Sequence, residues 1–289
     1  MSRIGTAFAM YESHFGLTGS PFNLSPDSAF FFQSRGHGNA LSYLQFGIYQ
    51  SEGFVVVTGE IGAGKTTLVR KVMAELDAAN VVAAQIVSTQ LEATDLLRSV
   101  CAAFGIQTSG LSKAELIASV EAFLTALVLE GKRVLLIIDE AQNLHREAIE
   151  ELRMLSNFQL GNRALLQSFL VGQPELRALL TSKSMEQLRQ RVIASCHLGP
   201  MDAAETQRYV LHRLEHVGWA NNPQFAPAAF DHIYRWSAGI PRRVNVLCNR
   251  LMLAAYLSQR SHIDEAMVDE VAREFQAETE LAGTPSEDR

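Results

Sequence analysis

The sequence predicts an α/β fold in three layers: a mainly parallel sheet of five strands lies between two layers of helices, and a small all-helical domain follows. Three observations lead to this prediction. Short strand patterns alternate with amphipathic helices between residues 54 and 198, as in parallel sheets built from crossover units. Only helical patterns remain beyond residue 201. A glycine-rich loop joins the first strand to the helix that follows it.

The strands are predicted from short runs of β-branched and other apolar residues, which favour buried strands. The first run starts at Phe54 and stops at Gly59. The others are expected at residues 81–88, 133–138, 165–171 and 195–198. Because such strands alternate with helices, we expect right-handed crossovers and a sheet that is covered on both faces.

Helices are predicted where apolar residues recur at helical spacing and where capping residues precede them. In the core they are expected at residues 65–78, 94–104, 113–130, 148–158 and 184–192. In the helical domain they are expected at 203–217, 227–236, 242–258 and 265–275. Two of these helices begin with a capping box, in which Ser112 pairs with Glu115 and Asp202 pairs with Glu205.

We divide the chain into an N-terminal arm (residues 1–50), a core (51–200), a helical domain (201–277) and a disordered tail (278–289). The arm opens with a disordered lead-in up to Met10 and closes with a helix that leads into the first strand. Its aromatic cluster of Phe30, Phe31 and Phe32 has two interpretations, since aromatic rings stack on adenine and also fill protein cores.

The composition is that of a globular protein and excludes several classes. Hydrophobic residues make up 47% of the 289 residues, and no apolar run approaches the ~18 residues that span a bilayer. A net charge of −6 argues against coating nucleic acid through bulk electrostatics, although a local basic patch stays open. Cys101, Cys196 and Cys248 show no metal-binding spacing, which indicates buried free thiols in a reducing cytosol.

The loop after the first strand fits the phosphate-binding pattern G-x-x-x-x-G-K-[ST]. Glycines let several backbone N–H groups approach one anion, and the start of the following helix adds positive potential. The predicted cradle consists of Gly59, Glu60, Ile61, Gly62, Ala63, Gly64, Lys65, Thr66 and Thr67. Lys65 is expected to reach the β- and γ-phosphates of ATP, and Thr66 to hold Mg²⁺. A chance match is disfavoured because strand, loop and helix come in the required order.

An acidic pair, Asp139 and Glu140, ends the third predicted strand. Acidic residues after a strand often only cap the next helix. Downstream of a phosphate-binding loop, however, such a pair suits a Mg²⁺–nucleotide site. Asp139 is then expected to hold the metal and Glu140 to polarise the attacking water.

Several motifs together resemble a known family. They are GEIGAGKTT, LLIIDEAQNL, LVGQPEL, LRQRV and GIPRRVN, preceded by YESHFGLTGSPFNLSPD. This combination is similar to the AAA+ ATPases related to general secretion pathway protein A, which include ATPases of pilus biogenesis and of exosortase and exopolysaccharide loci. The resemblance extends from Tyr11 to Phe275. It implies a P-loop AAA+ core followed by a helical lid.

The resemblance also implies roles for residues outside the loop and the acidic pair. Gln173 matches the position where the family has its sensor of the γ-phosphate. Arg242 matches the position of the second sensor, which would contact the nucleotide from the lid. Arg191 matches the arginine finger that reaches a neighbouring subunit's nucleotide, with Arg189 as the alternative. Ser88 and Thr89 stand where many AAA+ proteins have an asparagine that restrains the catalytic glutamate. Because the arginine finger would reach a neighbouring subunit, the resemblance also implies a homo-oligomeric ring, such as a hexamer.

The function that the resemblance implies is ATP hydrolysis that drives assembly of a secretion channel, a pilus or a polysaccharide exporter. The partners are then envelope assembly proteins, and the location is the cytoplasm or, through a partner, the inner membrane. Secretion members continue into a transmembrane segment and a peptidoglycan-binding module, which this sequence does not contain, so direct peptidoglycan binding is not expected. His145, His212 and His216 form no ligand set and are expected at the surface.

The alternative function is that of an ATP-dependent DNA-binding regulator, similar to the ATPases that select targets in transposition. Four arginines of the helical domain could contact phosphates: Arg235, Arg242, Arg243 and Arg250. The acidic total charge counts against a strong DNA-binding surface.

Overall fold

The computed structural model describes residues 10–87 and 90–282, which fall into two compact units. The sheet unit consists of residues 35–61 and 65–199. The helical unit consists of the chain up to Ser34, residues 62–64 and the chain from Pro200 onward. Ser88 and Thr89, the lead-in before Met10 and residues 283–289 of the expected tail lie outside the described residues.

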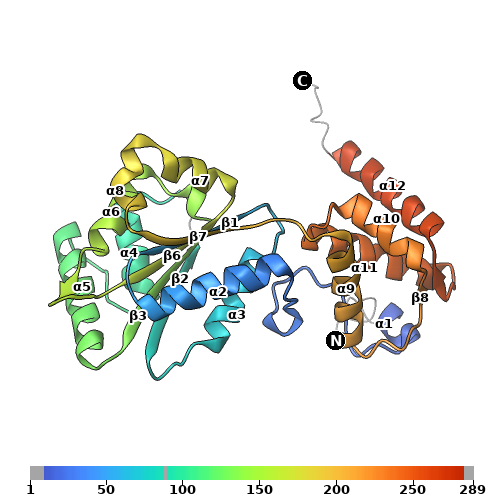
Figure 1. Cartoon of the computed structure of the whole chain (residues 1–289), viewed down its shortest axis with the longest axis horizontal. Coiled ribbons are helices and arrows are strands. Elements are labelled where there is room, and N and C mark those ends of the chain that lie inside the picture. Colours follow the sequence, from blue (N-terminus) through green and yellow to red (C-terminus); the bar gives the residue numbers. More distant parts are fainter. Residues whose placement is uncertain (1–9, 88–89, 283–289) are drawn as a thin grey trace. The chain divides into compact units, whose positions relative to one another are not determined.

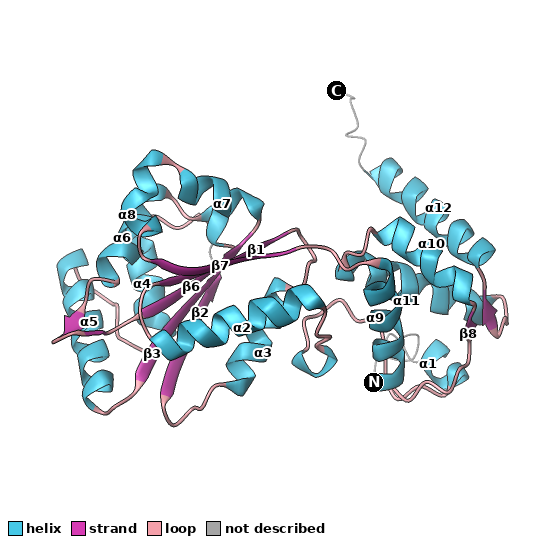
Figure 2. Ribbon diagram, in the orientation of Figure 1, coloured by secondary structure: helices cyan, strands magenta, loops and turns pink. Residues whose placement is uncertain are grey.

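The sheet unit is built on five strands that all run parallel, in the order β2-β3-β6-β1-β7 (Figure 2). They are β1 (Phe54–Gly59), β2 (Val81–Val87), β3 (Arg133–Asp139), β6 (Gln167–Gly172) and β7 (Val192–Leu198). The predicted parallel sheet is confirmed. Every residue of β1 and β6 is buried, as expected for central strands that are covered on both faces.

The sheet lies between two layers of helices (Figure 1). Helices α2 (Arg35–Gln50) and α3 (Lys65–Glu75) pack on one face. Helix α2 approaches β1 closely at Gly47, because a Cβ atom there would lie only 2.5 Å from Cγ2 of Val55. The opposite face, which includes Phe54 and Val56, forms one hydrophobic core with the remaining helices. These are α4 (Ala93–Ala103), α5 (Lys113–Leu129), α6 (Arg146–Leu155), α7 (Pro174–Thr181) and α8 (Glu186–Arg189). The predicted three-layer α/β core is confirmed.

Two helix predictions in the sheet unit need correction. The helix expected at 184–192 is a short 3-10 turn at Lys183–Met185 followed by α8, which ends at Arg189. The chain then turns into β7 because the carbonyl oxygen of Arg191 accepts a hydrogen bond from the Phe54 N–H group (2.9 Å) and β-branched residues follow. Helix α7 was not predicted from the sequence, although Pro174 stands at its first turn, a position that proline favours.

Four very short strands were not predicted from the sequence. Strands β4 (Gln159–Leu160) and β5 (Arg163–Ala164) form an antiparallel pair, while β8 (Gln224–Phe225) and β9 (His262–Ile263) form a parallel pair. The second pair corrects the expectation that only helices follow residue 201. Strands of two residues show no periodicity in the sequence, so pattern analysis cannot detect them.

The helical unit contains α9 (Ala203–His216), α10 (Pro227–Ser237), α11 (Pro241–Leu257) and α12 (Glu265–Ala282). The first three agree with the predicted ranges to within one residue, and the capping boxes at Ser112 and at Asp202 are both present. Helix α12 continues past the predicted end at Phe275, so residues 278–282 of the expected disordered tail are helical.

The first part of the N-terminal arm packs into the helical unit. It carries α1 (Met10–Phe15) and a 3-10 turn at Ser28–Phe30. Tyr11, Phe15, Leu17 and Phe22 are buried in the same hydrophobic core as α9 to α12. Phe30 and Phe32 pack against this core, and the Phe32 ring contacts Tyr209 edge-on. Of the two interpretations of the aromatic cluster, this packing supports the filling of a core for Phe30 and Phe32.

Arg213 of α9 ties the arm to the helical unit. Its guanidinium donates hydrogen bonds to the carbonyl oxygens of Pro21 and Asn23 and to the Tyr209 hydroxyl, and it lies 4.6 Å from the centre of the Phe30 ring. Only 6% of Arg213 is exposed. A buried charge is tolerated when hydrogen bonds of this kind replace its hydration.

We expect Arg213→Ala to lower the free energy of unfolding of the helical unit by about 2–3 kcal/mol, because it leaves buried acceptors unpaired. Urea denaturation followed by tryptophan fluorescence measures this change, since both tryptophans, Trp219 and Trp236, belong to the helical unit. Arg208→Ala, on the exposed side of the same helix, is the matched control. Equal denaturation midpoints for the two variants would contradict the proposed tie.

The free cysteines and the surface histidines follow the prediction with two exceptions. Cys101 and Cys248 are buried, whereas Cys196 is half-buried, and all three are free thiols. His145 and His216 are exposed, but His212 is half-buried beside the Phe32 ring. Over the described part of the chain, no helix combines the length and apolarity that crossing a membrane requires.

Candidate nucleotide site

The glycine-rich loop lies between the end of β1 at Gly59 and the start of α3 at Lys65. Gly62 and Gly64 adopt φ angles of 81° and 96°, a region that residues with a Cβ atom rarely enter. Ala63 is 2% exposed, whereas Ile61 at the outer side of the loop is 64% exposed. The loop therefore has the backbone conformation and the position, at a helix N-terminus, that phosphate binding needs.

Lys65 is held inside the loop. Its Nζ atom donates hydrogen bonds to the carbonyl oxygens of Gly59 (2.7 Å) and Glu60 (3.0 Å), and 6% of the residue is exposed. Burial lowers the pKa of Lys65, and the carboxylates of Glu140 and Asp139 oppose this shift. A buried ammonium group at a helix N-terminus is a strong attractor for phosphate oxygens.

Thr66 and Asp139 meet at the carboxyl edge of the sheet. The Thr66 hydroxyl donates to Oδ2 of Asp139 (3.0 Å), and the Glu140 N–H group donates to Oδ1 (3.0 Å). Asp139 is only 3% exposed, so burial raises its pKa, while the hydrogen bond from Thr66 opposes this shift. A positive charge placed beside this carboxylate would stabilise its ionised form.

A hydroxyl and a carboxylate fit Mg²⁺, which prefers oxygen ligands and commonly takes only one or two from the protein when phosphates supply others. Within residues 10–87 and 90–282, no group of three or more His, Cys, Asp or Glu side chains could hold a metal ion by itself. The donor set therefore fits an ion that arrives with a nucleotide, held through Thr66 and Asp139.

Glu140 follows Asp139 in a left-handed backbone conformation, with a φ angle of 53°. Its Oε2 atom accepts hydrogen bonds from Nε2 of Gln142 (2.6 Å) and from Nε2 of Gln173 (3.3 Å). Gln173 is the N-cap of α7, directly after β6. Three residues of the predicted site, Lys65, Asp139 and Glu140, thus lie at one edge of the sheet together with Gln173.

The predicted arginines have different surroundings. Arg191 is half-buried, and its Nη1 atom donates to the carbonyl oxygen (2.9 Å) and hydroxyl (3.2 Å) of Ser156. Arg189 is exposed and makes one longer hydrogen bond, to the carbonyl oxygen of Thr181 (3.3 Å). Arg242 is exposed at the second position of α11 in the helical unit, and its role stays a prediction.

Sequence reasoning missed Gln142 as a member of this cluster. The signal was present, because an amide two residues after Glu140 in the DEAQ stretch lies within reach of the carboxylate. The remaining member of the predicted cradle, Thr67, is half-buried on α3.

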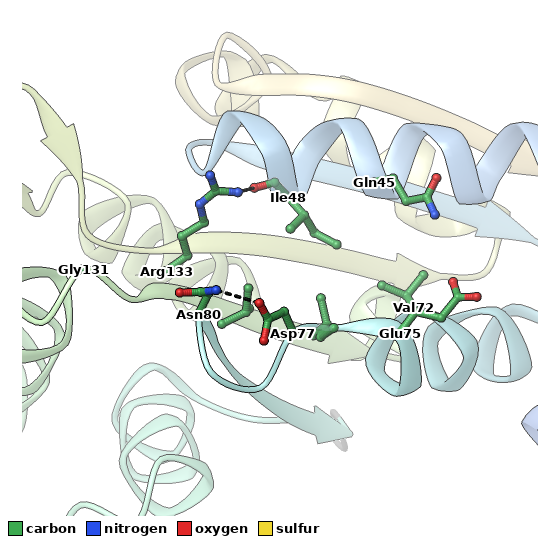
Figure 3. A pocket seen from close by; sticks show the side chains of 10 residues that line it. Gln45, Ile48, Val72, Glu75, Asp77, Asn80, Gly131 and Arg133 are labelled. Carbon is green, nitrogen blue, oxygen red and sulfur yellow. Dashed lines mark hydrogen bonds between the residues drawn. The ribbon is translucent and has the colours of Figure 1, made fainter.

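A hollow of about 430 Å³ lies at the other end of the sheet unit (Figure 3). It is lined by residues near the starts of β2 and β3, including Asn80, which donates to Asp77 (2.6 Å), and Arg133, which donates to the Ile48 carbonyl oxygen (3.2 Å). Ligands of open α/β sheets bind at the carboxyl ends of the strands. The edge that carries Lys65 and Asp139 is therefore the stronger candidate.

Comparison with known protein families agrees with this geometry. The profile of the family described as AAA domain matches residues 48–180. The matched range includes Lys65, Asp139, Glu140 and Gln173 and ends before Arg189 and Arg191.

The predicted resemblance to general secretion pathway protein A is confirmed. The chain is 37% identical over 250 residues to General secretion pathway protein A of Aeromonas hydrophila. The match covers 86% of this chain and 45% of the relative, so this chain spans less than half of that protein.

Several solved structures share the fold of this chain. Drosophila ORC bound to DNA aligns with a TM-score of 0.69 at 16% identity, covering 99% of this chain and 72% of that one. Cdc6p of Pyrobaculum aerophilum gives 0.66 at 18% identity, covering 90% and 75%. The ORC2 protein of Aeropyrum pernix in its ADPNP–ADP complexes gives 0.64 at 18% identity, covering 86% and 72%. Identities this low establish the fold alone.

Proposed function

We propose that the chain binds ATP with Mg²⁺ at the carboxyl edge of its sheet and hydrolyses it there. The observation that supports this most is the contact of Thr66 with Asp139 (3.0 Å), because it joins the phosphate loop to the acidic end of β3. An isolated glycine-rich turn has no reason to meet a buried carboxylate at a strand end. A shared metal–phosphate site explains both the contact and the burial of Asp139.

Each side chain has a distinct task in this proposal. The loop N–H groups and Lys65 bind the phosphates, while Thr66 and Asp139 hold Mg²⁺, which supplies positive charge to the phosphate oxygens when bound. Glu140 accepts a proton from the attacking water, and the amide of Gln173 orients that water or the γ-phosphate.

The test is phosphate release by the wild-type chain from ATP with Mg²⁺ and with excess EDTA. Release must occur and must depend on the metal, and a chain without turnover under either condition would refute the proposal.

Completion of the site by a neighbouring subunit is a further part of the proposal. A guanidinium stays charged and binds phosphate oxygens in a fork, so an arginine from the next subunit suits the developing charge. Arg191 is the first candidate, and Arg189, which is more exposed, is the second. The assembly would be a homo-oligomeric ring, such as a hexamer.

We expect loss of the true finger, by Arg191→Ala or by Arg189→Ala, to reduce kcat roughly 100-fold or more while ATP binding persists. Mixing the finger variant with Lys65→Ala should restore part of the turnover, because a Lys65→Ala subunit still offers its arginine to the intact site of a neighbour. Steady-state phosphate release measures both effects. If neither arginine variant is slowed, or if the mixtures show no gain, the finger does not act between subunits.

The process that this ATPase serves is proposed from the relative. The 37% identity to General secretion pathway protein A supports a role in assembling a secretion, pilus or exopolysaccharide export system, with envelope assembly proteins as partners. Such a role places the chain in the cytoplasm, or at the inner membrane through a partner. Replacing the chromosomal copy by Lys65→Ala should abolish the dependent envelope structure while protein levels stay normal. Normal assembly with this variant would argue against the role.

The alternative of a DNA-binding regulator gains little support from the helical unit. Arg250, one of its four candidate arginines, donates to Glu278 (2.7 Å) and lies 4.4 Å from the centre of the Phe275 ring. It is therefore already engaged within the protein. A salt-dependent shift of labelled DNA with a nonhydrolysable nucleotide would favour the alternative.

A further inference from the structure

Gln142 has no role in the proposed function, yet its side chain makes hydrogen bonds to both Glu140 and Gln173. It lies in the 3-10 turn Ala141–Asn143, between the end of β3 and the end of β6. Its Nε2 atom donates to Oε2 of Glu140 (2.6 Å), and its Oε1 atom accepts from the backbone N–H group of Gln173 (2.9 Å). One amide thus links the proposed base, Glu140, to the backbone of the proposed sensor, Gln173.

The orientation of this amide is fixed by its surroundings. A backbone N–H group can only donate, so the atom that faces Gln173 must be the oxygen of the Gln142 amide. The nitrogen is then directed at the Glu140 carboxylate, where a donor is needed. The same oxygen of Glu140 also receives the Gln173 amide at 3.3 Å, so two donors hold Oε2 and leave Oε1 for another partner.

The backbone at two other positions, Gly172 and Glu140, is consistent with these hydrogen bonds of Gln142. A Cβ atom at Gly172 would lie 2.5 Å from Oε1 of Gln142 and 3.3 Å from its backbone nitrogen, so any larger residue would displace the amide. Glu140 itself adopts the left-handed conformation, which costs a non-glycine residue free energy and persists only where the surroundings impose it. Such strain at the position of the proposed base fits a functional constraint.

We propose that Gln142 is a positioning residue that holds Oε2 of Glu140 and thereby presents Oε1 to the attacking water. The inference rests on the proposed ATPase function and assigns a residue to it. Gln142 would act through Glu140 and not through the nucleotide, so its loss changes the rate of the chemical step and leaves ATP affinity unchanged.

The decisive variant is Gln142→Met, which keeps the volume and removes both hydrogen bonds. We expect kcat to fall roughly 10- to 100-fold, with KM and the Kd for ATP within about two-fold of wild type, because misorientation of a catalytic group acts on the transition state. Gln142→Glu should be slower still, since it retains the acceptor for Gln173 but sets a second carboxylate against Glu140. Gln45→Met, at an exposed glutamine on α2, is the matched control and should behave as wild type.

Two further variants separate positioning from a purely structural role. Gly172→Ala leaves Gln142 in the chain but displaces its amide, so it should reproduce the fall in kcat. In a Glu140→Gln background, Gln142→Met should cause no further loss, because the group through which it acts is gone.

The outcomes are distinct. Wild type without turnover refutes the ATPase proposal itself, whereas active wild type with an equally fast or faster Gln142→Met variant refutes only the positioning role. A rise in KM or Kd at unchanged kcat would place Gln142 in nucleotide binding and overturn the inference. An additive loss in the Glu140→Gln background would do the same.

Discussion

Replacement of Glu140 by Gln is expected to leave ATP binding intact and to reduce kcat at least ~100-fold, as loss of a general base does. The substitution keeps the shape of the side chain and removes the charge that accepts a proton. It also turns Oε2, which receives two amide donors at 2.6 and 3.3 Å, into part of an amide that accepts less strongly. Phosphate release and binding of a fluorescent ATP analogue measure the two effects separately.

The matched control for this prediction is Glu121→Gln, at an exposed glutamate on α5 in the same unit. It removes the same charge far from the sheet edge and should leave both measurements unchanged. A Glu140→Gln variant that hydrolyses ATP at the wild-type rate would remove Glu140 from the mechanism.

Replacement of Lys65 by Ala is expected to weaken ATP binding by roughly 100-fold or more and to abolish turnover at ordinary ATP concentrations. A charged hydrogen bond in a buried site contributes strongly to affinity, and the loop N–H groups alone lack the cation that reaches the outer phosphates. The same variant also loses the side chain that now bonds the carbonyl oxygens of Gly59 and Glu60. Isothermal titration with ATP and Mg²⁺ measures the change in Kd.

Lys71→Ala controls for the loss of a lysine from the same helix, because Lys71 forms only a partly exposed ion pair with Glu75 (2.9 Å). It should bind ATP as wild type does. If Lys65→Ala retains wild-type affinity, the glycine-rich loop is not the phosphate site.

The sheet and most helices could be predicted because their signals are local. Buried strands such as β3 are runs of apolar residues, and Ser112 and Asp202 mark two helix starts through side chains that bond nearby backbone groups. The glycine-rich loop could also be predicted from the sequence, because glycine readily adopts the positive φ angles found at Gly62 and Gly64.

Other features depend on contacts between distant segments and could not be predicted from the sequence. The end of α8 depends on a hydrogen bond between Arg191 and Phe54, and the packing of the arm depends on bonds from Arg213 to Pro21 and Asn23. The hydrogen bond between Gln142 and the backbone of Gln173 became visible only when β3 and β6 were placed side by side in the sheet.

The proposed hydrolysis site is complete only when subunits associate, and one measurement tests this directly. Phosphate release at saturating ATP and Mg²⁺ is followed over a range of protein concentrations, for the wild-type chain and for Glu140→Gln. We expect wild-type turnover per subunit to rise with concentration, and the variant to stay near background throughout. Wild-type turnover per subunit that is the same at every concentration, or wild-type release that never exceeds that of the variant, would contradict this prediction.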